Sequence, residues 1–382
     1  MLMAMSNHKV IVITGAAGFI GSALTVDLAA DHAVIAIDRR EPSQALLDAA
    51  PSVIWRQIDI GDETALDTVF KDAARRFDRI DCVLHFAAFY HFGNNWRPEY
   101  QRTNIDGTEV VINAGIRNGA ERLIFASSLG AMLPPSKGKM LTERSPVSDY
   151  IPYAKSKAVG EALIRDSSKH LPATVLRIAG VFSDWCELPP LDSLMRMWAG
   201  QGPFNRVMVG RGETAIPYIH RDDLCRLVRC CIEQDHATPP FEIFFASQHG
   251  AVSHRQLFDC IHGTRADAAP AQPIFVRPAF ARIALYGQRA LGRVIGRPPF
   301  EHPWMLDYVD RPWVADTTHT RQKLNWDCRD DYSICHRLPT VVNHFRRDRR
   351  SWERRSRARK VADYVYSCDL PNNACSQEGD QQ

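Results

Sequence analysis

The sequence lacks the long apolar runs that membrane-spanning helices need. No stretch of its 382 residues reaches the roughly 18 uncharged apolar positions required to cross a bilayer. The opening residues, MLMAMSNHK, are too short for a secretion signal, and the stretch after them, VIVITG, is typical of a strand. The net charge is only +3, which gives no ground for nucleic acid as a partner. We therefore expect a cytoplasmic protein.

Signals for metal binding and for disulfides are also missing. The ten cysteines are scattered between positions 82 and 375, and the only adjacent pair is Cys230 and Cys231. No CxxC pair or His/Cys cluster has the spacing of a zinc site. We expect reduced thiols and no metal centre.

A dense block of positive charge does occur near the C-terminus. Residues 344–360, HFRRDRRSWERRSRARK, hold nine Arg or Lys against Asp348 and Glu353. Such a block predicts a polar helix or a solvated tail. The alternative is weak peripheral contact with an anionic surface, because clustered cations are attracted to anionic lipid by about 1 kcal/mol each.

The first half of the chain alternates short apolar, β-rich runs with helical patterns. This alternation predicts an α/β fold, a Rossmann-type doubly wound parallel sheet with helices on both faces. The predicted strands cover residues 9–15, 33–39, 53–60, 82–88, 122–128 and 173–182.

After Phe182 the pattern loosens, and prolines at 189, 190, 203 and 217 interrupt it. RVMVG and FEIFFAS predict further short strands, and residues 278–295 have a helical pattern. We expect three parts. They are an NAD(P)-binding Rossmann domain (9–182), a smaller irregular C-terminal substrate lobe (183–335) with some return of the chain to the first domain near 205–250, and a basic, flexible tail (336–382).

A glycine-rich turn follows the first predicted strand. In TGAAGFIGSAL, Gly15, Gly18 and Gly21 recur at steps of three, with Phe19 and Ile20 between the last two. Glycines permit the tight strand-to-helix turn and let the backbone approach a pyrophosphate at the positive end of the next helix. The context of a preceding strand and a following helix indicates a dinucleotide site.

The second predicted strand, AVIAID, ends in Asp38. A carboxylate there accepts hydrogen bonds from the adenosine ribose hydroxyls and repels a 2′-phosphate, which favours NAD over NADP. Arg39 and Arg40 follow at once, and an arginine at this place accommodates the phosphate, so NADP stays the less favoured alternative. The other reading of Asp38 is a simple turn residue.

A tyrosine and a lysine lie four residues apart in IPYAKSKAVGEAL. On a helix, Tyr153 and Lys157 share one face, so the ammonium can favour the ionised phenol and lower its pKa. The alternative, an ordinary solvated helix face, is common for such a pair taken alone.

Taken together, these motifs resemble the extended short-chain dehydrogenase/reductase superfamily, the group of the NAD-dependent epimerases and dehydratases. The resemblance extends over about residues 9–330 and includes the glycine turn, FASS ending in Ser128, and YAKSK as a YxxxK signature. It also includes IDIGD at Asp59 and Ile60, HFAA (85–88), the segment from Asn104, YIHRDDL (218–224) and RQKLNW (321–326).

The resemblance implies a role for each matched residue. Tyr153 would be the general acid/base, Lys157 would also bind the nicotinamide ribose, and Ser128 would orient the substrate oxygen. The implied cofactor contacts are Gly15, Gly18, Phe19, Ile20, Gly21, Asp38, Arg39, Asp59, Ile60, Ala87, Ala88, Asn104, Tyr153 and Lys157.

Four other residues are expected to have structural roles, and for one of them a second interpretation stays open. Asn104 either shapes the cofactor site or caps a helix N-terminus. His85 is expected to be a satisfied core histidine. His220 and Asp222 are expected to anchor the junction of the two lobes rather than to perform chemistry.

Two departures argue against a nucleotide-linked sugar as substrate. Gly180, in LRIAG, stands where sugar-nucleotide epimerases resemble LRYFN, and Ile216 stands where they carry an arginine. A diphosphate without such donors is poorly paired, unless Arg206 or Arg211 compensates. The form IPYIHRDDL resembles the steroid-dehydrogenase-like and reductase-like branches, and the aromatic stretches at 278–291 and 298–313 suit either a pocket or simple packing.

The leading hypothesis is an NAD-dependent oxidoreductase that moves hydride between nicotinamide and the hydroxyl or carbonyl carbon of a small molecule that is not a UDP-sugar. The first alternative is a nucleotide-sugar epimerase or dehydratase with tightly held NAD. The second is a non-catalytic NAD(P)-sensing protein. The resemblance also implies a homodimer as an option.

Overall fold

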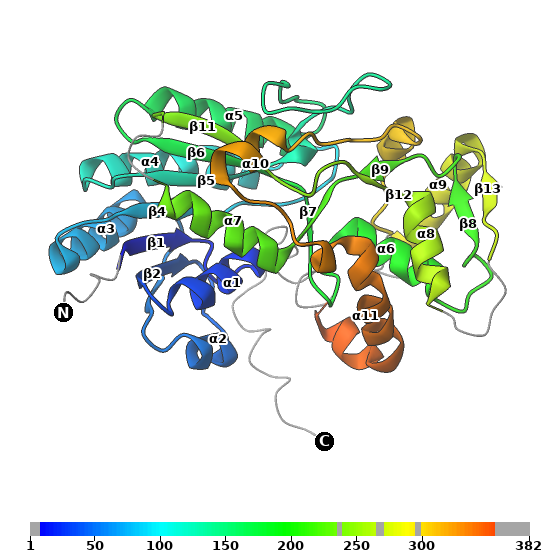
Figure 1. Ribbon diagram of the computed structural model, residues 1–382, viewed down its shortest axis with the longest axis horizontal. Helices are drawn as coiled ribbons and strands as arrows, with labels where there is room; N and C mark the ends of the chain where they lie inside the picture. The colour runs from blue at the N-terminus through cyan, green and yellow to red at the C-terminus, as the bar shows by residue number, and fades with distance from the viewer. Residues whose placement is uncertain (1–7, 235–238, 265–270, 295–298, 356–382) are drawn as a thin grey trace.

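The computed structural model describes residues 8–234, 239–264, 271–294 and 299–355. A seven-stranded sheet, in which every neighbouring pair of strands is parallel, has the order β11-β6-β5-β4-β1-β2-β3. Figure 1 shows this sheet and its helices in one half of the molecule and a smaller lobe in the other. The predicted Rossmann-type fold is confirmed. The strands are β1 (Val10–Thr14), β2 (Ala33–Asp38), β3 (Ile54–Gln57), β4 (Cys82–His85), β5 (Leu123–Ser128), β6 (Ala173–Ile178) and β11 (Phe241–Ala246).

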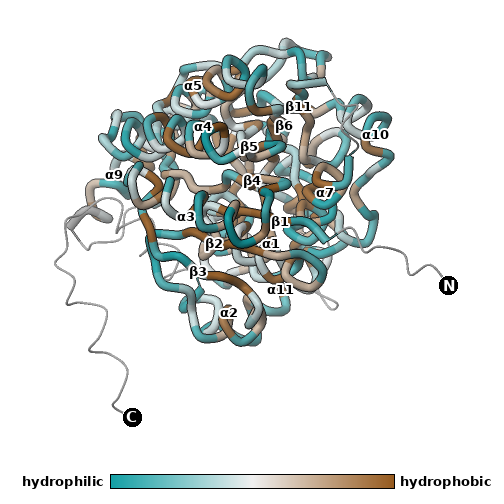
Figure 2. The backbone as a smooth tube through the Cα atoms, turned by 90° about the vertical axis from the view of Figure 1, so that its left-hand side faces the viewer, coloured by the Kyte–Doolittle hydropathy of each residue, from teal (hydrophilic) through white to brown (hydrophobic). Residues whose placement is uncertain are grey.

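Both faces of the sheet are covered, which explains why its strands are continuous apolar runs. Val10 and Val12 of β1 pack on one side with α3 (Glu63–Phe77), α4 (Gly107–Arg117) and α5 (Pro152–Ser167). Ile11 and Ile13 pack on the other side with α1 (Phe19–Leu28) and α7 (Arg221–Glu233). Figure 2 shows the apolar strands at the centre and the helices around them.

One predicted strand is split in the structure. The run 173–182 forms β6 and then β7 (Gly180–Phe182), which leaves the sheet and pairs with β10 (Tyr218–His220). The break occurs where the run reaches the carboxyl edge: the Ala179 N–H still donates to Ala246 of β11, whereas the Gly180 N–H donates to Pro217 (3.1 Å). The strand thus directs the chain from the sheet into the lobe.

The lobe has a core of its own, built by α6 (Pro189–Trp198), α8 (His254–Gly263), α11 (Ile334–Arg347) and β8 (Val207–Val209). Two further small pairings complete it, β9 (Ala215–Ile216) with β12 (Val252–Ser253) and β8 with β13 (Ile274–Val276). The remaining elements are α2 (Gln44–Ala49), a π-helix (Tyr100–Asp106), α9 (Pro278–Val294), α10 (Thr318–Leu324) and three 3₁₀ turns (Leu129–Ala131, Pro303–Tyr308 and Asp330–Tyr332).

The expectation of a separate tail from residue 336 is wrong for the part that the structure describes. That boundary falls inside α11, where Leu338, Val341, Val342 and Phe345 form a buried helix face. Trp352 is 1% exposed and donates from Nε1 to Asp192 (2.9 Å). The apolar residues between the arginines therefore fold this segment onto the lobe. Residues 356–382 lie outside the described residues.

A buried ion pair joins α5 to the sheet. Glu161 of α5 and Arg177 of β6 are 2.8 Å apart, and each side chain is 4% exposed. Arg177 also donates to the carbonyls of Glu143 (3.1 Å) and Ser145 (2.8 Å), and the Ser127 hydroxyl donates to Glu161. Every strong donor and acceptor of the pair is thus satisfied inside the core.

We expect Glu161→Leu to destabilise the protein by about 3–5 kcal/mol, because it leaves the Arg177 guanidinium buried without a counter-charge. Urea unfolding of the wild type and the variant measures the loss. The double variant with Arg177→Met should recover part of it, since both charges are then gone. Equal stability of the wild type and Glu161→Leu would contradict this account of the pair.

Candidate active site

A cavity of about 1460 Å³ lies beyond the carboxyl ends of the strands and continues into the lobe. This edge is where open α/β sheets bind ligands. Its sheet half is lined by the predicted cofactor and catalytic residues Gly15, Gly18, Phe19, Ile20, Gly21, Asp38, Arg39, Asp59, Ile60, Ala87, Ala88, Ser128, Tyr153 and Lys157. The fold thus gathers all of the predicted site residues except Asn104 around one space.

The glycine turn fits the backbone approach that a pyrophosphate needs. Gly15 has φ +74°, and a Cβ there would lie 2.6 Å from the Ala87 backbone nitrogen. A Cβ on Gly21 would lie 2.0 Å from the Gly15 carbonyl oxygen. Gly18 is the extended N-cap of α1 and leaves the helix end without a side-chain cap. The first amides of α1 therefore stay accessible to an anion.

Asp38 is built into this turn as well as lining the cavity. Its carboxylate accepts from the Ala17 amide (3.0 Å) and from the Arg40 amide (3.0 Å), and it pairs with the Arg40 guanidinium at 3.2 Å. The two interpretations of Asp38 are thus compatible, because one carboxylate both fixes the turn and faces the site. Arg40 sits beside the place where the ribose hydroxyls are expected.

Asn104 does not line the cavity, and it is not a helix N-cap. It lies inside a π-helix (Tyr100–Asp106) and is 3% exposed. Its side chain accepts from the Phe89 amide (2.7 Å) and donates to the Phe89 carbonyl and to Ser156 Oγ, both at 2.9 Å. Asn104 therefore ties the loop after β4, which includes Ala87 and Ala88, to α5.

Tyr153 is buried at the start of α5, where Pro152 is the first helical residue. The rings of Tyr90 and Phe92 lie 5.2 and 5.3 Å from its ring. Burial raises the pKa of Tyr153 to about 12, and a hydrogen bond with Ser128 acts in the opposite direction. At neutral pH the phenol of the chain is therefore protonated.

Lys157 lies one helical turn further along the same face and is 4% exposed. Its ammonium donates to the Ala126 carbonyl (2.7 Å) and lies 5.0 Å from the centre of the Phe125 ring. Burial lowers the pKa of Lys157 to about 8, against the attraction of Glu161.

Lys157 was expected to lower the pKa of the Tyr153 phenol, but it does not contribute to that pKa in the structure. Burial of Tyr153 has the larger effect and raises its pKa, and the only opposing contribution comes from Ser128. The lysine is directed to the Ala126 carbonyl. A phenolate would therefore need a further positive charge in the cavity.

His85 is a satisfied core residue, as expected. Its two ring nitrogens hydrogen-bond to Thr14 (2.8 Å) and Thr108 (3.0 Å), and burial lowers its pKa to about 3.

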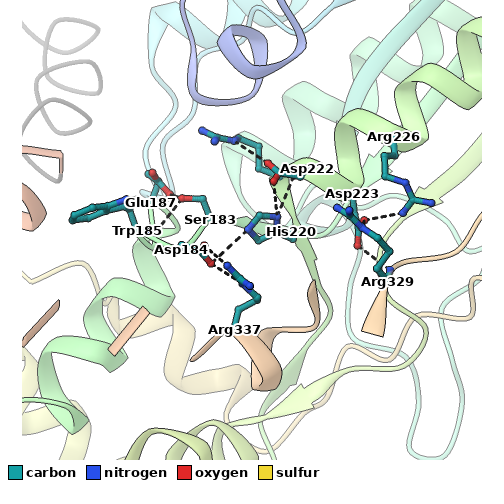
Figure 3. Close-up of polar contacts among 11 residues, drawn as sticks. Ser183, Asp184, Trp185, Glu187, His220, Asp222, Asp223, Arg226, Arg329 and Arg337 are labelled. Atoms are coloured by element: carbon teal, nitrogen blue, oxygen red, sulfur yellow. Dashed lines mark hydrogen bonds and ion pairs between the residues drawn. The ribbon is translucent and has the colours of Figure 1, made fainter. Parts of the chain in front are cut away.

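His220 and Asp222 lie at the junction of the two parts. His220 caps α7 by accepting from the Asp222 amide (3.2 Å), and its ring lies 4.7 Å from that of Tyr332. Figure 3 shows Asp184 paired with Arg337 beside this histidine, and Asp223 held between Arg226 (2.9 Å) and Arg329 (2.7 Å). These contacts join the start of α7 to residues 329–332 and to α11 of the lobe.

The lobe half of the cavity is largely apolar. Gly180 and Ile216 both line it, and a Cβ on Gly180 would already lie 2.9 Å from Leu188. Arg196 lines it too, but it is paired with Asp192 (2.9 Å) and Glu353 (2.6 Å). The apolar lining includes Leu188, Leu194, Met197, Trp198, Val207, Val209, Tyr218, Phe280, Leu285, Phe300, Trp304, Met305, Leu306, Val309 and Trp313.

Arg206 and Arg211, the two arginines considered as partners of a diphosphate, do not line the cavity. Arg206 donates to the Gln272 carbonyl (2.7 Å). Arg211 pairs with Glu213 (2.9 Å) and is 71% exposed. The stretches at 278–291 and 298–313, in contrast, contribute side chains to the wall of the cavity. Of the two expected roles, a pocket or simple packing, they therefore have the first.

Sequence reasoning missed the aromatic wall around the phenol. Tyr90 and Phe92 come from FYHFGNN, directly after HFAA, and Trp304 donates from Nε1 to the Phe92 carbonyl (3.2 Å). The run of aromatics at 89–92 was an available signal. Glu161 was missed as well, although it continues the four-residue spacing of Tyr153 and Lys157.

Comparison with known proteins decides the family. The model of the NAD dependent epimerase/dehydratase family matches residues 11–245. The chain belongs to this family. The resemblance seen in the motifs is thereby confirmed, as are the predicted enzyme class and NAD as cofactor.

The curated relatives of this epimerase/dehydratase family member are similar over part of their length. UDP-glucose 4-epimerase 4 of Oryza sativa subsp. japonica is 29% identical over 175 residues, 43% of this chain and 46% of that protein. The dTDP-D-glucose 4,6-dehydratase of Mus musculus is 28% identical over 184 residues, which are 46% of this chain and 52% of that protein. The matched region spans about half the length of these relatives.

Solved structures show the same fold over most of the chain. UDP-glucose 4-epimerase of Thermotoga maritima with UDP-glucose is 22% identical and covers 88% of this chain and 98% of its own, with a TM-score of 0.65. Bordetella bronchiseptica WbmG with NAD is 19% identical and covers 91% of this chain and 97% of its own, with a TM-score of 0.67.

None of the described helices is long and apolar enough to cross a membrane. The eight cysteines within the described ranges are free thiols, and no group of three His, Cys, Asp or Glu in those ranges is arranged to hold a metal.

The lowered pKa of Lys157 predicts a pH dependence of stability. The unfolded chain keeps this proton up to about pH 10.5, and the folded chain only up to about pH 8. The unfolded state thus binds more protons between these values, so this lysine destabilises the protein less as pH rises through them. We expect the stability of the wild type to increase relative to Lys157→Met over this interval, as urea unfolding at several pH values would show. Parallel curves for the two proteins would contradict the buried ammonium.

Proposed function

We propose that the protein is an NAD-dependent oxidoreductase that transfers hydride between nicotinamide and the hydroxyl or carbonyl carbon of a bulky, largely apolar substrate. The observation that carries this proposal is the position of Tyr153. Its phenol hydrogen-bonds with Ser128 and, with Lys157, lines the same cavity as the glycine turn and the apolar residues of the lobe.

The sheet half has the shape and the donors that NAD requires. Gly15, Gly18 and Gly21 would admit the pyrophosphate to the end of α1, and Asp38 would accept hydrogen bonds from the adenosine ribose. The carboxylate favours NAD over NADP, although its pair with Arg40 weakens the repulsion of a 2′-phosphate. NAD, when bound, supplies the hydride chemistry.

Tyr153 would hold and move the proton. Its pKa of about 12 in the chain keeps the phenol protonated, which suits donation to a carbonyl oxygen during reduction. In the oxidation direction the same group would accept the proton of a hydroxyl. That direction needs added positive charge beside the phenol, and an oxidised nicotinamide has such a charge.

Ser128 and Lys157 would support this proton transfer. The Ser128 hydroxyl contacts the phenol and can donate to charge developing on the substrate oxygen. The Lys157 ammonium donates to the Ala126 carbonyl at 2.7 Å, and it would also bind the nicotinamide ribose. Its burial with a fixed partner keeps it in place without rearrangement during the reaction.

The substrate class follows from the lining of the lobe half. A diphosphate carries charge that must be paired, and the arginine lining this half, Arg196, is neutralised by Asp192 and Glu353. Methionine, tryptophan and leucine side chains there favour an apolar body, such as that of a sterol or an isoprenoid alcohol or ketone.

A second candidate is a nucleotide-sugar epimerase or dehydratase, in which hydride returns to the same molecule. The names of the relatives, UDP-glucose 4-epimerase and dTDP-D-glucose 4,6-dehydratase, favour it. The non-catalytic NAD(P)-sensing alternative is disfavoured because Ser128, Tyr153 and Lys157 are all present and line one cavity. Cytoplasmic location and a homodimer stay predictions.

The substitution Tyr153→Phe should reduce turnover at least about a hundredfold, because it removes the proton that general acid catalysis requires. The affinity for NAD, measured by calorimetry, should stay within about twofold, since the ring and its packing are retained. Phe92→Tyr, which adds a hydroxyl in the same aromatic wall, is the matched control. Wild-type turnover by Tyr153→Phe would exclude the proton-transfer role.

A substrate screen separates the two enzyme candidates. The purified protein with added NAD is followed by NADH fluorescence against sterols, isoprenoid alcohols and sugar nucleotides. We expect net NADH formation with an apolar alcohol. Conversion of a sugar nucleotide, detected by mass spectrometry without net NADH, would establish the second candidate instead.

A further inference from the structure

The end of the lobe farthest from the sheet exposes an unusual amount of apolar surface. Among the described residues, every large apolar side chain that is at least half exposed lies there. They come from α9, from β13 and from the turn before β8, which Figure 1 places together at this end. We call them the lobe-end patch: Phe204 (65%), Ile274 (50%), Phe275 (52%), Phe280 (65%), Ile283 (71%), Tyr286 (58%) and Leu291 (62%).

The solvent face of α9 is mostly apolar, and Arg282, whose side chain is 40% exposed, lies on this helix as well. Leu285 and Gly292 turn inward, and the exposed stripe on the opposite side consists of small and apolar residues and one tyrosine, with the exposed Gln288 at its border. A solvated helix normally has polar and charged residues on this face. The stripe is Ala279, Phe280, Ile283, Ala284, Tyr286, Gly287, Ala290 and Leu291.

Arginines recur before, within and after the stripe along the sequence. Between positions 271 and 300 the sequence has arginines at 277, 282, 289, 293 and 297 and no Asp or Glu. Arg282 pairs with Asp307 across an exposed edge, and Arg289 donates to the Glu301 carbonyl (2.8 Å). A helix with an apolar face, an interfacial tyrosine and flanking arginines has the character of one that lies in the surface of an anionic bilayer.

The patch is continuous with the cavity. Phe204, Phe280, Ala284 and Leu291 are exposed and also line the cavity wall. The apolar half of the cavity therefore opens within the apolar surface.

We propose that the lobe-end patch is a membrane-docking surface, in which α9 lies in the headgroup region of an anionic bilayer. Ile283, Tyr286 and their neighbours insert, and the flanking arginines face lipid phosphates. The role of this docking, to let an apolar substrate pass from the bilayer into the cavity, rests on the proposed function. The docking itself does not, because it needs neither NAD nor substrate.

Vesicle binding by the full chain tests the proposal. The protein, without NAD or substrate, is sedimented with vesicles of phosphatidylcholine alone or of phosphatidylcholine and phosphatidylserine in equal parts. We expect binding to the mixed vesicles that survives high salt in part, since inserted apolar groups are not screened. Ile283→Glu and Tyr286→Glu should each weaken it about tenfold or more.

Matched controls keep the outcome decisive. Val26→Glu introduces the same charge at a 37% exposed site on α1 and should bind like the wild type. Because Ile283 and Tyr286 lie outside the cavity lining, their variants should keep the thermal stability of the wild type. Tyr286→Trp should show a blue-shifted emission on mixed vesicles.

Three results would overturn the proposal. The first is no binding to either vesicle. The second is binding that high salt abolishes and that Ile283→Glu leaves unchanged, which would assign it to the basic C-terminal segment. The third is a dimer in sedimentation velocity that Ile283→Glu dissociates, which would make the patch an interface between two copies of the chain. Binding without turnover on apolar alcohols would instead contradict only the proposed function.

Discussion

The buried pair of Glu161 and Arg177 is the contact on which the candidate active site depends. It fixes the middle of α5 to the C-terminal end of β6. Tyr153, Lys157 and Glu161 recur every four residues, so they share one helix face. The turn that is anchored by the ion pair therefore sets the position of the turns that carry the lysine and the phenol.

The buried polar contacts around this pair work in the same direction. Lys157 reaches the Ala126 carbonyl, and Asn104 joins the loop after β4 to Ser156 of α5. Such groups are costly to bury unless each finds a partner, and here the partners come from different strands and helices. The polar network thus holds the loop, the helix and the strand ends in one arrangement, whereas apolar packing alone would leave their relative positions less specified.

The cavity joins two chemical environments. On the sheet side are backbone amides, glycines and a carboxylate, and on the lobe side are mostly aliphatic and aromatic side chains. The phenol of Tyr153 lines this cavity beside the rings of Tyr90 and Phe92, and its burial raises its pKa. The same burial that makes the phenol a poor base on its own makes it responsive to a neighbouring positive charge, because charges interact more strongly where water is excluded.

Much of the fold and the site was predictable because local constraints determine it. The Gly15 turn needs a positive φ and a close backbone approach, and both leave a trace in the sequence. Features that depend on tertiary contacts were not predictable. The role of Asn104 comes from a π-helix facing a distant loop, the pKa of Tyr153 is governed by burial rather than by Lys157, and the basic segment is folded because Phe345 and Trp352 pack on the lobe.

The central claim is that NAD lies along the glycine turn with its nicotinamide against Tyr153. A crystal structure of the purified chain with NAD tests it most directly. We expect the adenosine ribose at Asp38, the pyrophosphate at the N-terminus of α1, and the nicotinamide within contact distance of the Tyr153 ring and Lys157. NAD bound elsewhere, or a nicotinamide out of reach of the phenol, would contradict the account.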